Sequence, residues 1–516
     1  MDQSVPTPTA TQDDDAYPGA TMPKIVIFSI VGSLMMTMLL QALFQTVLST
    51  ALPKIIISLH GLDRFTWVMT AYFLGMTAIV PIVGRLSDQF GARRFLLAGV
   101  VIFIGGTLLG GFANSMDVLI AARAIQGIGG GMGMTLVMIA LGDLFSPKDR
   151  GRWQGLFGAT FGVASIVGPV IGGWFTDNGP LVGGFVTEAT RWRWIFFAMV
   201  PVGLLTFAAL WRYMPATRGK SHDGPRMPLY KRIDLAGAVL STSGTVTLLL
   251  ALVWGGQPQH GWGSVEVLSL FASAAILFAA FIAVERVVAS PLLPLILFTD
   301  RSYIGNALIA LSAGTAMMGI ATYMPLFMQN VLGMTATSSG ATITPMMLSF
   351  ITGATISGFL VGRFGHYRRA AMVAAIILLV GGGMLALMTP QSSVSHAVVA
   401  IVIAGLGIGS MFPLITLLAQ ASAPRHLLGA ATANVTYFRS TGQVMGVAVV
   451  GTVVTHSLAV RLGGPTPTNL LGLPTEPLGF AIIDGFMVVV AAGVIALLAT
   501  TLLREPAATA ERRERA

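Results

Sequence analysis

Four charged side chains lie in one short segment between two long uncharged runs of the sequence. The segment from Gly84 to Arg94 reads GRLSDQFGARR, with Asp88 among three arginines, whereas residues 66–83 and 95–112 carry no charge. A carboxylate near basic groups can exchange ion-pair partners when neighbouring helices move. The segment therefore predicts a charged contact that opens and closes, placed in a tight turn by its two glycines.

A further charged residue stands inside an apolar run. Residues 119–131 read LIAARAIQGIGGG, which places Arg123 about six residues inside one end of a run that can cross a bilayer. A charge at that depth costs at least about 2–3 kcal/mol, so we expect Arg123 to face a polar cavity or a partner. Gln126 follows on the same helical face. The alternative is an arginine whose side chain extends to the outer membrane surface.

The sequence offers little for catalysis or metal binding. The chain has no cysteine, and none of its 21 carboxylates or 7 histidines falls near the midpoint of an apolar run. No nucleophile stands in a pattern with a base. We therefore expect no enzyme, no metal site and no cofactor.

The composition describes a membrane protein with many spans. Of 516 residues, 54% are hydrophobic and 10% are charged, and the mean hydropathy is +0.79. Soluble domains carry about 25% charged residues. The net charge of +9 would also suit a nucleic-acid partner. We expect no such partner, because the basic residues gather in loops on one side of the membrane.

Fourteen apolar runs are long enough to cross a bilayer as helices, which needs about 20 residues. They cover residues 24–51, 66–84, 95–112, 118–141, 154–176, 194–211, 235–255, 265–285, 303–326, 338–361, 370–389, 397–419, 431–455 and 481–503. An even number places both termini on one side. If that side is the cytosol, inside loops and tails hold 23 of the 30 Lys and Arg residues and outside loops hold five. The positive-inside rule therefore predicts cytosolic termini.

The second half of the chain repeats features of the first. Residues 358–369 read GFLVGRFGHYRR, a decayed copy of the charged segment displaced by 274 residues, from Gly84 to Gly358 and from Gly91 to Gly365. The same offset takes Gly168 to Gly442. Two six-helix units, with the seventh and eighth spans inserted between them, explain this pattern. Coincidence among 61 glycines is the alternative.

The fifth run carries closely spaced small residues. After Gly158 and Gly162 come Gly168, Pro169, Gly172 and Gly173. Glycines every four residues let another helix approach closely, and the proline adds a kink. Helix packing alone would account for such a stripe in an arbitrary membrane protein.

These motifs resemble those of the major facilitator superfamily, and in particular its fourteen-span drug:proton antiporter family of multidrug efflux proteins. Segment 84–94 is similar to G-x-L-[SA]-D-x-x-G-x-R-R, and residues 123–131 are similar to R-x-x-Q-G-x-G-x-G. The stripe of the fifth run is similar to G-x-x-x-G-P-x-x-G-G, which marks the antiporters. Arg439 begins a further match in span 13.

The resemblance implies roles for individual residues. The cytosolic gate and its coupling to protons would involve Gly84, Asp88, Gly91, Arg94, Asp143, Arg123 and Gln126. The antiporter motif would be Gly168, Pro169, Gly172 and Gly173. The substrate cavity would be lined by Gln41, Phe44, Gln45, Tyr72 and Arg439.

One departure from the family pattern concerns the first span. Members of the family usually carry an aspartate where this chain has Phe44. The missing carboxylate leaves Arg123 to pair with glutamine oxygens or with an anionic cargo. It also removes the counter-charge for a cationic substrate, so we expect neutral or anionic amphiphiles to be preferred. The alternative is a cavity that binds cations through aromatic faces and glutamine oxygens and needs no acid. Which group would carry a proton is left open.

Together these features predict an all-α membrane protein of the major facilitator fold, with two six-helix bundles and two inserted helices. The expected divisions are a disordered cytosolic tail (1–22), the N-terminal bundle (23–211), a basic cytosolic linker (212–233), the inserted pair (234–286), a cytosolic connection (287–302), the C-terminal bundle (303–504) and a cytosolic tail (505–516).

The predicted function is secondary active export of amphipathic small molecules by proton antiport and alternating access. We expect a monomer in a bacterial-type inner membrane, in contact with its substrate, protons and the lipid bilayer. A lipid or glycolipid exporter of the same fold is the main alternative, made more plausible by the missing carboxylate. An uptake permease is disfavoured by the stripe in the fifth run.

Overall fold

The computed structural model describes residues 22–59, 65–215, 234–255, 260–288, 291, 293–334, 336–423, 427–463 and 474–504. Within these residues the chain is helical, apart from turns, loops and one isolated bridge between Val182 and Val186. Thirteen of the described helices are long and apolar enough to cross a membrane. The expected fifth span falls on one more helix, α6 (Pro147–Asn178), which carries no charge between Arg152 and Asp177. The predicted all-α fold class is confirmed.

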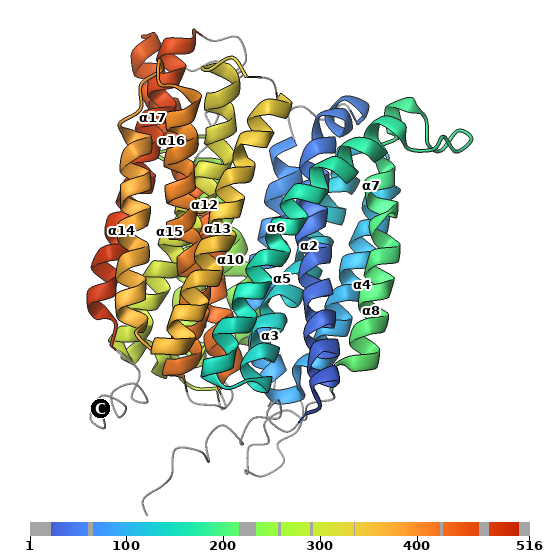
Figure 1. Cartoon of the computed structure of the whole chain (residues 1–516), viewed down its shortest axis with the longest axis vertical. Coiled ribbons are helices and arrows are strands. Elements are labelled where there is room, and N and C mark those ends of the chain that lie inside the picture. The colour runs from blue at the N-terminus through green and yellow to red at the C-terminus, as the bar shows by residue number, and fades with distance from the viewer. Residues whose placement is uncertain are drawn as a thin grey trace, which may run out of the picture.

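Two bundles stand side by side with their helices running along the same axis (Figure 1). The N-terminal bundle consists of α2 (Lys24–Ser58), α3 (Phe65–Phe90), α4 (Ala92–Gly111), α5 (Met116–Leu144), α6, η3 (Glu188–Thr190), α7 (Arg193–Phe197) and α8 (Met199–Tyr213). The C-terminal bundle consists of η4 (Leu295–Thr299), α12 (Arg301–Asn330), α13 (Ala336–Phe364), α14 (Tyr367–Ala386), α15 (Val394–Ser422), α16 (Leu428–Leu462), α17 (Thr475–Ala499) and η6 (Thr500–Leu502). Between them in sequence come α10 (Leu235–Gly255) and α11 (Val265–Glu285).

Polar residues at the helix starts explain several boundaries. The Ser115 hydroxyl accepts from Val118 N at 3.3 Å before α5, and Asp300 accepts from Ser302 N at 2.8 Å before α12. Such caps satisfy N–H groups that have no partner within the helix. Some helices extend beyond the expected spans: α2 continues past residue 51 to Ser58, and α16 continues past residue 455 to Leu462. The sixth expected span falls on α7 and α8, which meet at Ala198 and together make one candidate span, Arg193–Tyr213.

The two halves share details of backbone and packing. Gly91 has φ 86° between α3 and α4, and Gly365 has φ 68° between α13 and α14, a conformation that side chains other than glycine rarely adopt. The hydroxyl of Thr46 on α2 donates to Ala164 O on α6 at 2.9 Å. In the same way, Thr315 on α12 donates to Gly442 O on α16 at 3.1 Å. Gly91 and Gly365 are related by the offset of the sequence repeat, and the two threonine hydrogen bonds each join the first long helix of a bundle to its fifth.

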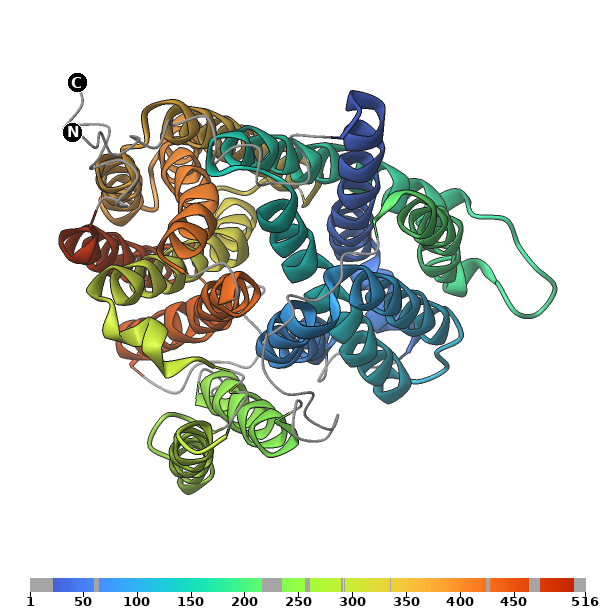
Figure 2. The same ribbon diagram turned by 90° about the horizontal axis from the view of Figure 1, so that it is seen from below.

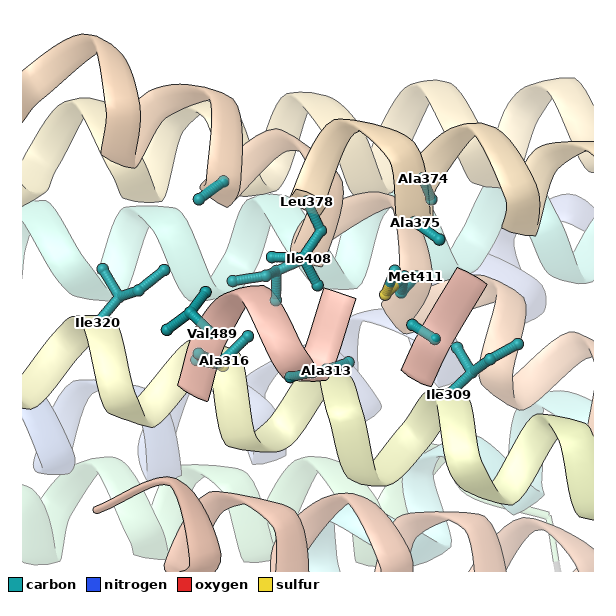
Figure 3. Close-up of a cluster of buried hydrophobic side chains, with 14 of the residues drawn as sticks. Ile309, Ala313, Ala316, Ile320, Ala374, Ala375, Leu378, Ile408, Met411 and Val489 are labelled. Atoms are coloured by element: carbon teal, nitrogen blue, oxygen red, sulfur yellow. The ribbon is translucent and has the colours of Figure 1, made fainter. Parts of the chain in front are cut away.

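Small and branched side chains fill the core of the C-terminal bundle. Figure 3 shows Ala313 and Ala316 of α12 near Val489 of α17 and Ile408 of α15. Alanines at these positions allow the helices to pack closely, and the branched residues occupy the remaining space. The bundle is therefore a packed unit that can move as one body.

The inserted pair α10–α11 lies on the outside, beside α16 and α3 (Figure 2). Leu249 and Leu252 of α10 pack against Val444 and Ala448 of α16, with Phe73 of α3 at the edge of the cluster. The Thr245 hydroxyl bonds to the Tyr437 hydroxyl at 3.2 Å, and the indole nitrogen of Trp262 donates to the Thr452 hydroxyl at 2.5 Å. The pair is thus fastened chiefly to α16. Both expected tails and most of the expected basic linker lie outside the described residues.

Candidate functional site

Asp88 joins the two bundles at one end of the molecule. Its side chain, near the end of α3, is only 6% exposed. Oδ1 accepts from Gly429 N at 2.9 Å, and Oδ2 accepts from Ala430 N at 3.0 Å, both in the first turn of α16. The first N–H groups of a helix lack partners within it, and this end carries partial positive charge. We call the end of the molecule that holds this contact the Asp88 end.

Arg94, which the sequence suggested as the partner of Asp88, makes no described contact with it. Arg94 is exposed and makes no ion pair within the described residues. The backbone of α16 instead provides donors from the opposite bundle. The prediction that Asp88 and Arg94 together close the gate stays a prediction; in the described contacts Asp88, and not Arg94, is bonded to the opposite bundle.

Glycine is required on both sides of this contact. A Cβ on Gly84 would overlap the Cβ of Ala433, and a Cβ on Gly429 would overlap the Asp88 carboxylate. These helices approach so closely that only a hydrogen fits at either position. Gly84 therefore acts in the contact itself, whereas Gly91, with its positive φ, makes the turn that follows.

A second polar contact lies next to it. The Gln420 side-chain nitrogen, on α15, donates to Met138 O on α5 at 3.1 Å and to the Thr432 hydroxyl at 3.3 Å. A Cβ on Gly142 would come within 2.9 Å of the same nitrogen. The predicted gate residue Asp143 follows Gly142 and is half-buried. Gln420 was missed by sequence analysis, because a glutamine in an apolar run does not reveal its partner.

Arg123 is fully buried inside the N-terminal bundle. Its Nε donates to Val68 O at 3.1 Å and its Nη1 donates to the Gln126 side-chain oxygen. Gln126 in turn donates to the Thr107 hydroxyl at 2.7 Å. The expected Arg123–Gln126 pair is present, and the alternative of a side chain extended to the outer membrane surface is wrong.

Aromatic rings enclose the same guanidinium group. Its Cζ lies 4.3 Å from the centre of the Tyr72 ring and 5.5 Å from that of Phe44. The predicted proximity of Phe44 and Arg123 is thus confirmed. Phe44 is 1% exposed and packs edge-on against Phe103 and Phe196. In this conformation it belongs to the bundle core and lines no open space.

The predicted cavity glutamines lie on the inner side of α2. Gln41 is buried so closely against α5 that a Cβ on Gly133 would overlap its side-chain nitrogen. Gln45 is half-buried and hydrogen-bonded to the Tyr72 hydroxyl. Gln45, Tyr72 and Arg123 therefore form one polar strip between α2, α3 and α5.

Arg439 lies about a third of the way along α16 and faces the opposite bundle. It is 7% exposed, its Cζ lies 4.7 Å from the centre of the Phe412 ring, and Nη2 lies 3.9 Å from the Met134 sulfur on α5. Its Nε has no hydrogen-bond partner within the described residues. Unlike Arg123, it is held by weak contacts alone.

The glycine stripe of α6 contacts both bundles. A Cβ on Gly168 would overlap the Thr46 hydroxyl of α2, and a Cβ on Gly162 would overlap Ile351 of α13. Gly172 is buried and its carbonyl accepts from Thr176, whereas a Cβ on Gly173 would meet nothing within 4 Å. A neighbouring helix thus packs closely against Gly168 but not against Gly173. The side chain of Pro169 lies outside the described residues.

The described hydrogen bonds between the bundles lie between the Asp88 end and the middle of the molecule. They join Asp88 to Gly429 and Ala430, Gln420 to Met138, and Arg439 to Met134. Within the described residues, no group of three or more His, Asp or Glu side chains is placed to hold a metal ion. Two helical bundles with buried cations and polar contacts at one end define a membrane carrier.

The chain belongs to the Major Facilitator Superfamily, whose family model matches residues 34–447. It is 37% identical over 454 residues to the multidrug transporter protein MdtP of Bacillus subtilis (strain 168), covering 88% of this chain and 80% of that protein. It is 32% identical over 433 residues to Multidrug resistance protein 3 of the same organism, covering 84% and 80%.

Solved structures support the same fold. The human organic anion transporter MFSD10 (TETRAN) matches with a TM-score of 0.63 at 14% identity, covering 94% of this chain and all of that one. The proton:xylose symporter XylE also matches with a TM-score of 0.63 at 14% identity, covering 92% and 95%. At this level of identity the similarity concerns the fold alone.

Proposed function

We propose that this protein exports amphipathic small molecules across the cell membrane by alternating access. Similarity to two bacterial proteins named as multidrug transporters supports the substrate class. The observation that carries the mechanism is the Asp88 contact with α16. This contact joins the two bundles through one side chain and two N–H groups. Because it consists of two hydrogen bonds, rocking of the bundles would break few interactions at this point.

The proposed energy source is the proton gradient, used in antiport. Asp88 is the carboxylate best placed to link protonation to bundle movement, because a neutral acid would bind the α16 N-terminus more weakly than a carboxylate. The proposed setting is a bacterial-type inner membrane, with the Asp88 end and both termini in the cytosol and the protein acting as a monomer.

Everted membrane vesicles test the function. A pH-sensitive dye enclosed in the vesicles would report proton movement while candidate amphiphiles are added one at a time. Export by antiport predicts substrate uptake into these vesicles together with proton release from them. Uptake without any pH response would leave export intact and refute the proton coupling.

Lipid or glycolipid export is the second candidate function. It is favoured by Phe44, which stands where the family usually has an acid and packs within the bundle core. Proteoliposomes loaded with a fluorescent lipid distinguish the two, because a lipid exporter would move the labelled lipid between leaflets and a drug exporter would not.

A further inference from the structure

Arg439 stands at a depth where a charge needs a partner. It lies eleven residues after Leu428, the first residue of α16, or about 16 Å along the helix axis at 1.5 Å per residue. Counted from residue 431, where the expected span begins, the depth is eight residues or about 12 Å, which lies well inside an apolar layer of about 30 Å. Charged residues there usually pair with each other or mark a substrate pathway.

The described part of the chain gives Arg439 no such partner. No carboxylate forms an ion pair with it, and its hydrogen-bonding contact is the weak one with the Met134 sulfur at 3.9 Å. Arg123 makes two hydrogen bonds to oxygen acceptors, with Val68 and Gln126. Nη2 of Arg123 has no hydrogen-bond partner within the described residues. The two arginines therefore differ in that Arg123 is bonded to oxygen acceptors, whereas the hydrogen-bonding contact described for the Arg439 side chain is to a sulfur.

The surroundings of Arg439 fit the rest of an amphiphile. Gln443 follows at i+4 on the same face of α16, and its side-chain oxygen also lacks a hydrogen-bond partner. Phe412, Met134 and Met317 supply an aromatic ring and two thioethers around these two polar groups. Methionine side chains adapt to differently shaped apolar surfaces. The arrangement combines one cation with an adaptable apolar wall.

We propose that Arg439 binds the anionic group, a carboxylate or a phosphate, of an amphiphilic substrate between the two bundles. The planar guanidinium can donate two parallel hydrogen bonds to such a group. Gln443 would bind a polar group further along the substrate, and Phe412 and the methionines would contact its apolar body. This inference rests on the proposed export function and specifies its substrate class.

Transport by purified protein in proteoliposomes tests the proposal. The probes are an aromatic dye with a carboxylate, its neutral methyl ester and a cationic analogue of the same size. We expect Arg439→Gln to export the carboxylate dye at least about tenfold more slowly, the loss that follows removal of a charge-assisted hydrogen bond. Export of the ester should change little. Arg439→Lys should recover part of the carboxylate export, because it keeps the charge but not the planar donor pair.

Controls separate this role from folding and from the function itself. Arg461→Gln removes an arginine that pairs with Asp484 at the opposite end and should leave all three rates unchanged. Equal slowing of ester and carboxylate export in Arg439→Gln would overturn the proposal, as would a wild type that exports only the cation. A wild type that exports none of the dyes would instead refute drug export.

The source of the anionic group is decided by a lipid arm of the same experiment. Labelled phosphatidylglycerol and phosphatidylcholine replace the dyes. Arginine-dependent movement of phosphatidylglycerol alone would identify a lipid phosphate as the ligand, and movement of the carboxylate dye alone would identify a soluble anion. Both results support the site, and movement of neither anion overturns it.

Discussion

Asp88 shows how one carboxylate can serve as a releasable link. Both of its oxygens are occupied by N–H groups of α16, and Gly429 leaves room for it. The interaction combines two hydrogen bonds with the favourable effect of a negative charge at a helix N-terminus, worth up to about 2 kcal/mol where partly buried. Neither the hydrogen bonds nor the charge effect depends on burying a large apolar surface between the bundles.

We expect Asp88→Asn to abolish export while the protein still inserts into the membrane. The substitution removes the charge and turns an NH₂ group towards one of the two backbone donors. Export rates of the variant and the wild type, normalised to the amount in the membrane, measure the effect. Asp149→Asn, at an exposed aspartate on the same side of the molecule, is the matched control. Equal normalised rates for Asp88→Asn and wild type would contradict the role.

We also expect Phe44→Asp to shift selectivity towards cations. The new carboxylate would lie beside Arg123, whose guanidinium is 5.5 Å from the present ring, and would stay ionised there. Loss of the aromatic packing would destabilise the bundle by about 3–5 kcal/mol. Phe44→Asn has the same packing defect without the charge. Efflux of a cationic and a neutral dye is measured in both variants, and an unchanged ratio in Phe44→Asp would refute the prediction.

At the scale of residues, the sequence identifies candidate site residues more readily than it identifies their contact partners. The unusual types stand out from the apolar runs, and Arg123 with Gln126 could be paired because both lie on one helix. The partner of Asp88 lies 341 residues away. Nothing in the spacing of Leu428, Gly429 and Ala430 marks them as hydrogen-bond donors to the other bundle, since every helix start has free N–H groups.

At the scale of elements, α6 packs mainly against two helices, α2 of its own bundle and α13 of the other, and its glycines contact both. Gly168 lies against Thr46 within its own bundle, and Gly162 lies against Ile351 across the interface. Contacts of one helix with both bundles are a direct structural connection between the bundle interior and the interface. The hydropathy pattern predicted the helix, but which glycine contacts which neighbour depends on helix rotation, which the pattern does not fix to a single residue.

We expect Gly168→Leu to impair export and Gly173→Leu to leave it intact. At Gly168 even the Cβ would overlap the Thr46 hydroxyl, which donates to Ala164 O, so overpacking should cost about 1–3 kcal/mol. At Gly173 an added Cβ meets nothing within 4 Å. Export and thermal unfolding of the two purified variants are compared. Normal export by the Gly168 variant would show that close approach there is not needed.

At the scale of the whole molecule, the orientation in the membrane can be tested cleanly because the chain contains no cysteine. We expect Glu188→Cys, on η3 away from the Asp88 end, to react with a membrane-impermeant maleimide in intact cells. Arg286→Cys, just after α11, should react only after the cells are permeabilised. Both positions are exposed. The reverse labelling pattern would invert the orientation that the basic residues predict.

The position of α10 and α11 affects how a substrate dissolved in the lipid could enter the space between the two bundles. The two bundles meet along two lateral seams, one between α3 and α16 and one between α6 and α13. Helix α10 packs against both α3 and α16 at the first seam and is hydrogen-bonded to α16, and α11 packs on α10. On the helices of the second seam, Val163 and Val170 of α6 and Ile356 of α13 are exposed apolar side chains. When the bundles part, a hydrophobic molecule that approaches from the lipid would therefore meet α10 at the first seam and the apolar side chains of α6 and α13 at the second.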